Sequence, residues 1–231
     1  MKTMVKYIFV VLVTVFFCCG TLSAQVIRIA NDSSGIPQDE FEDVMANLKA
    51  KIKDFGDALE KLTCVDCGYS SSSKKAVAED ALVLFMGEGD PYLTKMADRY
   101  GVVRDIMAKP VEIEFITSKY NQKKTKQPMK RYLTNLANRP QVAKKSVRLD
   151  TVAGFRVDNI TETGDGKWVA IVSVNVLTEI YNAEDAIKYR DVTHKTIQVF
   201  LERIEEETLY GPNRVRWIIK LGDMKAEEII D

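Results

Sequence analysis

Four side chains of the sequence could take part in acid–base chemistry. They are Tyr132, Asp150, Asp158 and His194, the only histidine in the chain. A small isomerase or lyase needs a general base beside an apolar pocket and donors that stabilise an enolate oxygen, and these residue types can supply them. Asp150 and Asp158 are separated by about 26 Å on one expected strand, which is too far for a joint carboxylate mechanism.

The pattern around His194 argues against a catalytic role for it. Ile197, Val199 and Leu201 alternate along an expected strand, and this aliphatic face is the better candidate for the core. His194 then falls on the opposite face with Thr196, exposed or at an interface. A single histidine also makes a histidine-based metal site improbable. We therefore expect no catalytic residue, no metal and no cofactor.

Cys64 and Cys67, in "CVDC", form the second reactive set. They come at the end of an expected helix, whereas a redox-active pair is expected at a helix start, where the helix dipole stabilises a thiolate. Two thiols alone cannot complete a tetrahedral zinc site. The pair is interpreted as a structural disulfide, with thiol–disulfide exchange as an alternative.

Residues 1–24 have the layout of a secretory signal peptide. Two lysines precede an apolar run over 7–19, and small and polar residues lead to Ala24. The run is too short to span a bilayer comfortably, and no later stretch reaches the roughly 20 apolar residues of a membrane span. We expect a periplasmic or extracellular protein with no stable membrane span after cleavage; a lipoprotein anchored through Cys18 or Cys19 is the less favoured alternative.

Charge is balanced overall but unevenly distributed along the chain. The sequence has 33 basic and 33 acidic residues, so the overall charge predicts no partner, and nucleic acid is not expected. The segment 119–148 contains basic residues and no acidic ones, which favours an anionic partner such as a polysaccharide or an acidic protein face; a solvated helix face and loop is the alternative. The residues singled out are Lys119, Lys123, Lys124, Lys126, Lys130, Arg131, Lys144 and Lys145.

Apolar spacing predicts helices in the first half of the chain. Apolar residues recur over 41–62 at steps of four and three, which indicates an amphipathic helix opened by Pro37. This helix packs either on the body of the protein or on a second copy. The segment "CGYSSSSKK" is predicted to be a flexible break. Further helices are expected over 74–90, 91–107 and 126–140.

Alternating patterns predict strands in the second half. Together with the helices before them, these strands predict an α+β fold, with a curved antiparallel sheet packed by N-terminal helices and preceded by an extra amphipathic helix. Strands are expected over 111–120, over 146–163 with a bend at Gly154, and over 168–177, 191–204 and 214–224.

This order of elements resembles the nuclear transport factor 2-like superfamily, the cone of SnoaL-like and ketosteroid-isomerase-like proteins. The resemblance covers Lys75 to Asp231 and includes "DALVLFMGEGD" and the paired strands around "GDGKW" and "YRDVTHKTIQV". It implies a cystatin-like cone with a pocket on its concave face and a dimer formed through the sheet. The expected organisation is a signal peptide over 1–24, an amphipathic helix and Ser-rich linker over 25–73, and the cone over 74–231.

These observations favour an exported, non-enzymatic binding module of the cell envelope. Its expected partners are a second copy of the chain or an envelope protein, an anionic polymer, or a small ligand. Two alternatives remain: a small isomerase or lyase that uses a pocket carboxylate or tyrosine, and thiol–disulfide exchange through Cys64 and Cys67.

Overall fold

A computed structural model describes most of the chain. The predicted signal peptide, the bend at Gly154 and three of the singled-out residues, Lys119, Lys144 and Asp150, lie outside the described residues. The described ranges are 35–64, 67–97, 103–116, 123–138, 145–149, 155–181, 186–207 and 213–230.

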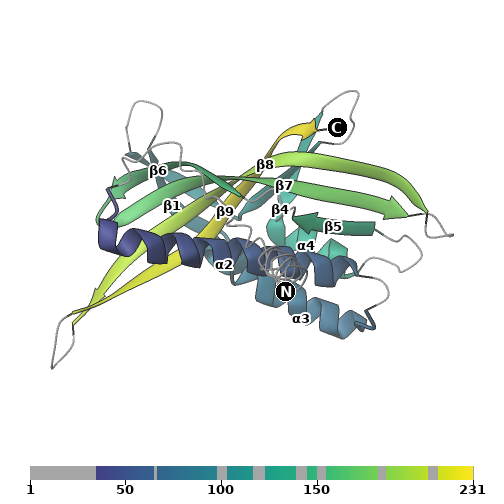
Figure 1. Cartoon of the computed structure of the whole chain (residues 1–231), viewed down its shortest axis with the longest axis horizontal. Helices are drawn as coiled ribbons and strands as arrows, with labels where there is room; N and C mark the ends of the chain where they lie inside the picture. Colours follow the sequence, from purple (N-terminus) through teal and green to yellow (C-terminus); the bar gives the residue numbers. More distant parts are fainter. Residues whose placement is uncertain are drawn as a thin grey trace, which may run out of the picture.

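Three helices pack against one side of a seven-stranded curved sheet (Figure 1). The strands follow the order β4-β3-β9-β8-β7-β5, and β6 also pairs with β7. All pairings in this sheet are antiparallel except β3 with β9. The α+β prediction is thereby confirmed. The helices are α2 (Gln38–Thr63), α3 (Ser71–Leu82) and α4 (Met129–Ala137), and the strands are β3 (Glu112–Ile116), β4 (Lys124–Pro128), β5 (Lys145–Leu149), β6 (Arg156–Gly164), β7 (Lys167–Tyr181), β8 (Ile187–Glu206) and β9 (Arg214–Ile230).

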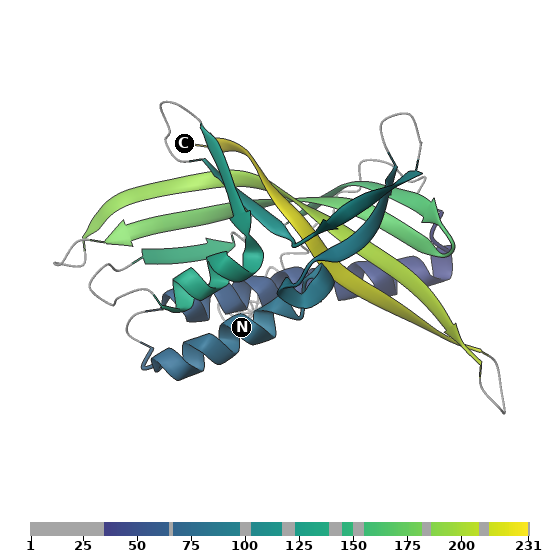
Figure 2. The same cartoon turned by 180° about the vertical axis from the view of Figure 1, so that it is seen from behind.

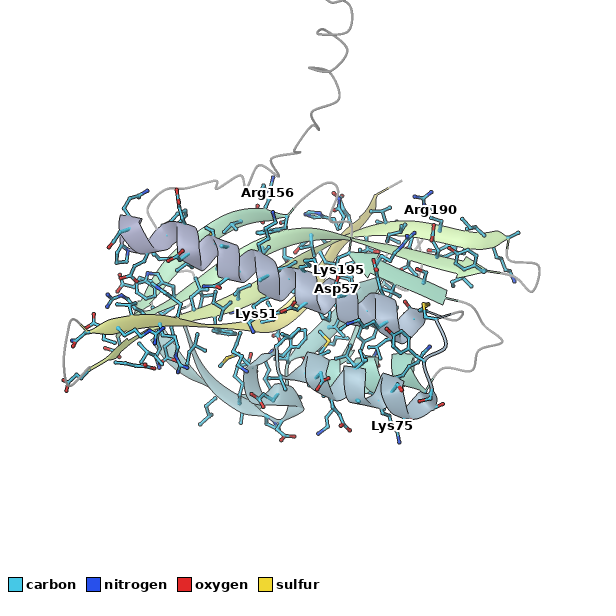
Figure 3. The ribbon with its side chains drawn as sticks, turned by 60° about the horizontal axis from the view of Figure 1, so that its bottom comes forward. Lys51, Asp57, Lys75, Arg156, Arg190 and Lys195 are labelled. Atoms are coloured by element: carbon cyan, nitrogen blue, oxygen red, sulfur yellow. A yellow bond between two sulfur atoms is a disulfide. The ribbon has the colours of Figure 1, made fainter. Side chains whose placement is uncertain are left out.

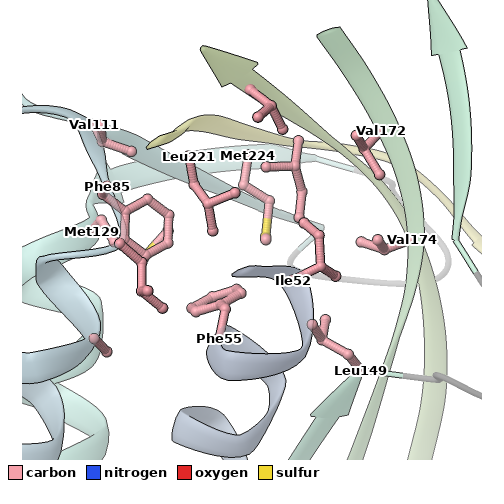
Figure 4. Close-up of a cluster of buried hydrophobic side chains, with 14 of the residues drawn as sticks. Ile52, Phe55, Phe85, Val111, Met129, Leu149, Val172, Val174, Leu221 and Met224 are labelled. Atoms are coloured by element: carbon pink, nitrogen blue, oxygen red, sulfur yellow. The ribbon is translucent and has the colours of Figure 1, made fainter. Parts of the chain in front are cut away.

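The apolar stripe of α2 is buried in the core of its own chain, which decides between the two packings left open by the sequence. Phe55 is fully buried, and its ring meets Phe85 edge to face with centroids 5.1 Å apart. Figure 4 shows Ile52 and Phe55 among side chains of the sheet, including Leu221 and Met224. Among the described residues, no helix is both long and apolar enough to cross a membrane.

The helix predicted over 91–107 is wrong. This segment forms a β-hairpin of β1 (Tyr92–Ala97) and β2 (Val103–Lys109), a separate two-stranded sheet. It follows the short 3-10 helix η1 (Met86–Gly89), in which Gly87 and Glu88 have positive φ. The apolar spacing of the segment is irregular, so a distant contact decides its structure: Tyr92 is buried and its ring lies edge to face on Phe200, with centroids 6.1 Å apart.

The serine-rich segment is not the flexible break predicted from its composition. Ser70 is the N-cap of α3, and its hydroxyl accepts a hydrogen bond of 3.1 Å from the backbone N–H of Ser73. Serine competes with the helical backbone in a helix interior but satisfies the free N–H groups of the first turn. The serine-rich segment that suggested a linker therefore forms the N-terminus of α3.

The long bent strand predicted over 146–163 is two strands. β5 pairs with residues 176–180 of β7, and β6 pairs with residues 167–173 of the same strand. Because β7 has 15 residues, it is long enough to pair with both along one edge. Sequence alternation alone does not show where such a strand is interrupted.

Candidate functional site

A groove of about 610 Å³ borders the sheet, and most of the strand residues that line it, among them Phe200 and Ile218, belong to the outer face, opposite α2. Phe200 belongs to this face because its neighbours Val199 and Leu201 point into the core. Figure 2 shows β1 and β2 crossing in front of β8 and β9 on the side away from α2. The residues that line the groove are Met86, Leu93, Thr163, Gly164, Asp165, Lys167, Trp168, Val169, Phe200, Leu201, Glu202, Ile218 and Lys220.

The floor of the groove is apolar and depends on a glycine. A Cβ atom at Gly222 would lie 2.7 Å from Cε2 of Phe200, so the absence of a side chain lets the Phe200 ring lie close to β9. Leu93, on β1, is 74% exposed and forms part of the wall. Covering this exposed leucine and the apolar floor with another apolar group would remove apolar surface from water and so favour binding.

Both lysines of the groove form ion pairs with glutamates, whereas the carboxylate of Asp165 has no such partner among the described residues. Nζ of Lys167 lies 3.2 Å from Oε1 of Glu202, and Nζ of Lys220 lies 3.0 Å from Oε1 of Glu88. Asp165, in the turn between β6 and β7, makes no side-chain hydrogen bond or ion pair within the described part of the chain. The groove therefore has an apolar floor and an excess negative charge at the end formed by this turn.

The described lining of the groove holds one hydroxyl side chain and four charged ones. The described lining has no histidine or cysteine. Its one hydroxyl side chain, Thr163, donates a hydrogen bond of 3.1 Å to the carbonyl of Lys167. A hydroxyl nucleophile needs an adjacent base to remove its proton, and Thr163 instead uses that proton to hold the turn.

Asp158 and His194, two of the acid–base residues singled out from the sequence, are each hydrogen-bonded to a different partner. Oγ of Ser173 donates to Asp158, which also pairs with Arg156. His194 lies on the outer face as predicted, with Nδ1 3.0 Å from Oδ1 of Asn175. The serine, histidine and aspartate thus share a region of the sheet, but Ser173 is hydrogen-bonded to the carboxylate and not to His194.

Tyr132, another of the candidate acid–base residues, is buried in the core. It is 6% exposed, and its ring lies 5.2 Å from that of Phe115 between centroids. Burial raises the pKa of the Tyr132 hydroxyl far above its ordinary value, because the surrounding side chains cannot solvate a phenolate. Such a tyrosine stays neutral at physiological pH and contributes packing.

The basic residues singled out from the sequence are divided by the sheet order. Lys124 and Lys126 are exposed along the edge strand β4, and Lys123 is exposed just before it. Lys130 and Arg131 are exposed in the first turn of α4. β5, which carries the backbone of Lys145, lies at the other end of the strand order. Nζ of Lys126 also donates to Glu112 at 3.0 Å, so part of the positive charge of β4 is paired.

Lys195 is a buried charged residue that the sequence analysis did not propose as a site residue. It is 4% exposed although it continues the aliphatic face of β8. Its Nζ donates to the carbonyl of Glu114 at 2.5 Å and lies 4.6 Å from the ring centroid of Phe115. In Figure 3 Lys75 points outward, whereas Lys195 lies within the body of the molecule. The break it makes in the apolar alternation is the signal that could have identified it.

Cys64 and Cys67 form a disulfide at the C-terminal end of α2, with Cα atoms 5.8 Å apart. The carbonyl of Cys64 also accepts a hydrogen bond of 2.8 Å from Nζ of Lys74 on α3. Both contacts constrain the turn that joins the two helices. Among the described residues, no group of three or more His, Cys, Asp or Glu side chains is placed to hold a metal ion.

Replacing Cys64 and Cys67 together by serine is expected to lower the free energy of unfolding by about 2 kcal/mol, because the disulfide closes a short loop in the unfolded chain. Urea unfolding of the oxidised protein and the double variant measures this. Dithiothreitol should lower the stability of the wild type and leave the variant unchanged. Unchanged stability combined with loss of insulin reduction would instead indicate thiol exchange.

The chain was also compared with protein-family models, with curated protein sequences and with solved structures. None of them matches the chain.

Proposed function

We propose that this protein is an exported binding module without catalytic activity and that the groove is its binding site. The observation that carries the proposal is the exposed Leu93 above the apolar floor around Phe200. The layout of residues 1–24 supports export. Ligand sites are typically concave, largely apolar and bordered by a few polar groups, and this groove has that character.

We also propose that the domain is a variant of the nuclear transport factor 2-like cone. Its helices pack on one side of a curved sheet, as the resemblance implies. In this chain, Ile52 and Phe55 of α2 pack against the inner face that those proteins use for a pocket. Because α2 covers the inner face in this chain, we place the proposed binding site on the opposite face of the sheet.

Replacing Leu93 by aspartate is expected to weaken binding of a neutral apolar probe, N-phenyl-1-naphthylamine, by about tenfold, because a carboxylate beside the floor has to be desolvated. The probe gains fluorescence in an apolar site, so titration at constant protein concentration measures the effect. Leu93 is mostly exposed, and the substitution should leave the thermal midpoint nearly unchanged.

Ile187→Asp is the matched control, since Ile187 is 52% exposed on β8, far along the strand from the groove residues Phe200 and Leu201. It should leave probe binding unchanged. Equal loss of binding in both variants, or in neither, would contradict the assignment of the site. Turnover of a substrate by the wild type would contradict the non-catalytic part of the proposal.

A further inference from the structure

We propose that the groove captures an extended peptide segment of a partner protein by adding it as a third strand to the free edge of β1. The apolar side chains of the peptide cover Phe200 and Ile218, and a basic residue at one end lies beside Asp165. This inference rests on the proposed function and specifies the ligand class that the groove takes.

The first support is an unpaired strand edge. β1 pairs with β2 alone in the part of the chain that the structure describes, so its other edge carries backbone N–H and C=O groups outside any ladder. Leu93 of β1 lines the groove, so this strand borders it. Peptides commonly bind by adding a strand to such an edge, where main-chain hydrogen bonds provide affinity.

The second support is the marginal size of the β1–β2 sheet. Two-stranded hairpins are barely stable in water, and a third strand adds both a ladder and covered apolar surface. The hairpin is held on the seven-stranded sheet by Tyr92 against Phe200 and, at its base, by Lys109, whose Nζ lies 2.5 Å from Oδ2 of Asp223. Six residues of β1 offer a pairing length of about 20 Å.

A comparison with β4 shows that not every free edge is equally open. β4 is also an edge strand, but Lys124 and Lys126 are exposed along it, and lysines on an edge oppose pairing with another chain. β1 carries one lysine, Lys95, where β4 carries two, and it has Leu93 exposed over an apolar floor. The edge of β1 is thus the better site for strand addition.

The third support is charge. The two lysines of the groove are each paired with a glutamate, Lys167 with Glu202 and Lys220 with Glu88. The carboxylate of Asp165 has no such partner among the described residues. A peptide with alternating apolar residues and a lysine or arginine at one end matches the floor and this carboxylate together.

The test uses synthetic peptides on the full exported protein, with fluorescence polarisation as the readout. The probe is the labelled peptide VTVTVTK, and its comparisons are VTVTVTQ and a VTVTVTK peptide N-methylated at alternate backbone amides. N-methylation leaves the side chains in place and removes the donors that a ladder requires. We expect the N-methylated peptide to bind about tenfold more weakly.

Asp165→Asn is the protein variant for the charge contact. It should weaken VTVTVTK about threefold to tenfold and leave VTVTVTQ unchanged, since the exposed carboxylate contributes only through the peptide cation. Glu207→Gln is the matched control because Glu207 is an exposed carboxylate outside the groove. It should change neither affinity.

Four outcomes would overturn the inference. Equal binding of the N-methylated peptide would exclude strand addition, and equal sensitivity of both peptides to Asp165→Asn would exclude the charge contact. Binding of N-phenyl-1-naphthylamine without binding of any peptide would contradict the inference and leave the proposed function intact. If Leu93→Asp affected neither probe nor peptides, the proposed function would fail as well.

Discussion

Replacing Phe55 by alanine is expected to lower the free energy of unfolding by about 3 to 5 kcal/mol, the largest effect of any substitution considered. Phe55 is fully buried where α2 crosses the sheet, and its ring meets Phe85 edge to face. Alanine removes the apolar contacts and leaves a cavity that neighbouring side chains fill only in part. Urea unfolding followed by circular dichroism measures the change.

Val83→Ala is the control for Phe55→Ala. Val83 is an apolar residue just after α3 and is 51% exposed, so its truncation should cost less than about 0.5 kcal/mol. A loss of under about 1 kcal/mol for Phe55→Ala would contradict the packing of α2 on its own sheet. It would instead favour packing on a second copy, which a dependence of stability on protein concentration would reveal.

Replacing Glu40 by alanine is expected to cost about 3 kcal/mol, because Glu40 ties the N-terminal part of α2 to the β8–β9 ribbon. Its carboxylate accepts hydrogen bonds from Nε and Nη2 of Arg203, at 2.9 and 2.8 Å, and from Nε1 of Trp217 at 2.7 Å. The ring of Trp217 in turn lies 5.0 Å from that of Trp168 between centroids. Loss of the carboxylate leaves three N–H donors, on two side chains, without their acceptor in a partly buried contact.

A double-mutant cycle with Arg203→Ala separates this contact from other effects of the two substitutions. The coupling between Glu40 and Arg203 should account for most of the loss seen in Glu40→Ala. Glu42→Ala, an exposed carboxylate on the same helix, is the matched control and should change stability by less than about 0.5 kcal/mol. Independent, additive losses for Glu40 and Arg203 would show that the hydrogen-bonded pair does not hold α2.

The same contact predicts a pH dependence. Hydrogen bonds from Arg203 hold the pKa of Glu40 below its ordinary value of 4.5. A carboxyl with a lowered folded pKa contributes its stabilisation fully above the ordinary value and loses it as the pH falls through the folded value. The stability gap between the wild type and Glu40→Gln should therefore be constant near neutral pH and narrow below pH 4.5. A gap that widens with acid would contradict this.

Elements with a regular apolar period were predictable because the period itself states which residues are buried. The steps of four and three along α2 correspond to its buried stripe, and the alternation of Ile197, Val199 and Leu201 corresponds to the inner face of β8. That alternation also placed His194 on the outer face. These assignments depend on side chains of one element, so local spacing is sufficient for them.

The groove could not be predicted, because each part of it depends on residues distant in the sequence. Its wall is β1, whose conformation is decided by the contact between Tyr92 and Phe200. Its floor needs Gly222 on β9 to make room for that phenylalanine on β8. Because a helix was predicted over 91–107, the strand that forms the wall of the groove, and so the groove itself, could not be inferred from the sequence.

By itself, the sequence determined the fold class, the amphipathic stripe of α2 and the face of β8 that enters the core, since these follow from the spacing of apolar residues within single elements. The tertiary structure alone decided that β7 pairs with both β5 and β6, that 91–107 is a hairpin, and that this hairpin borders a groove on the outer face. Those features arise from pairing and packing between segments far apart in the chain, and no local period records such contacts.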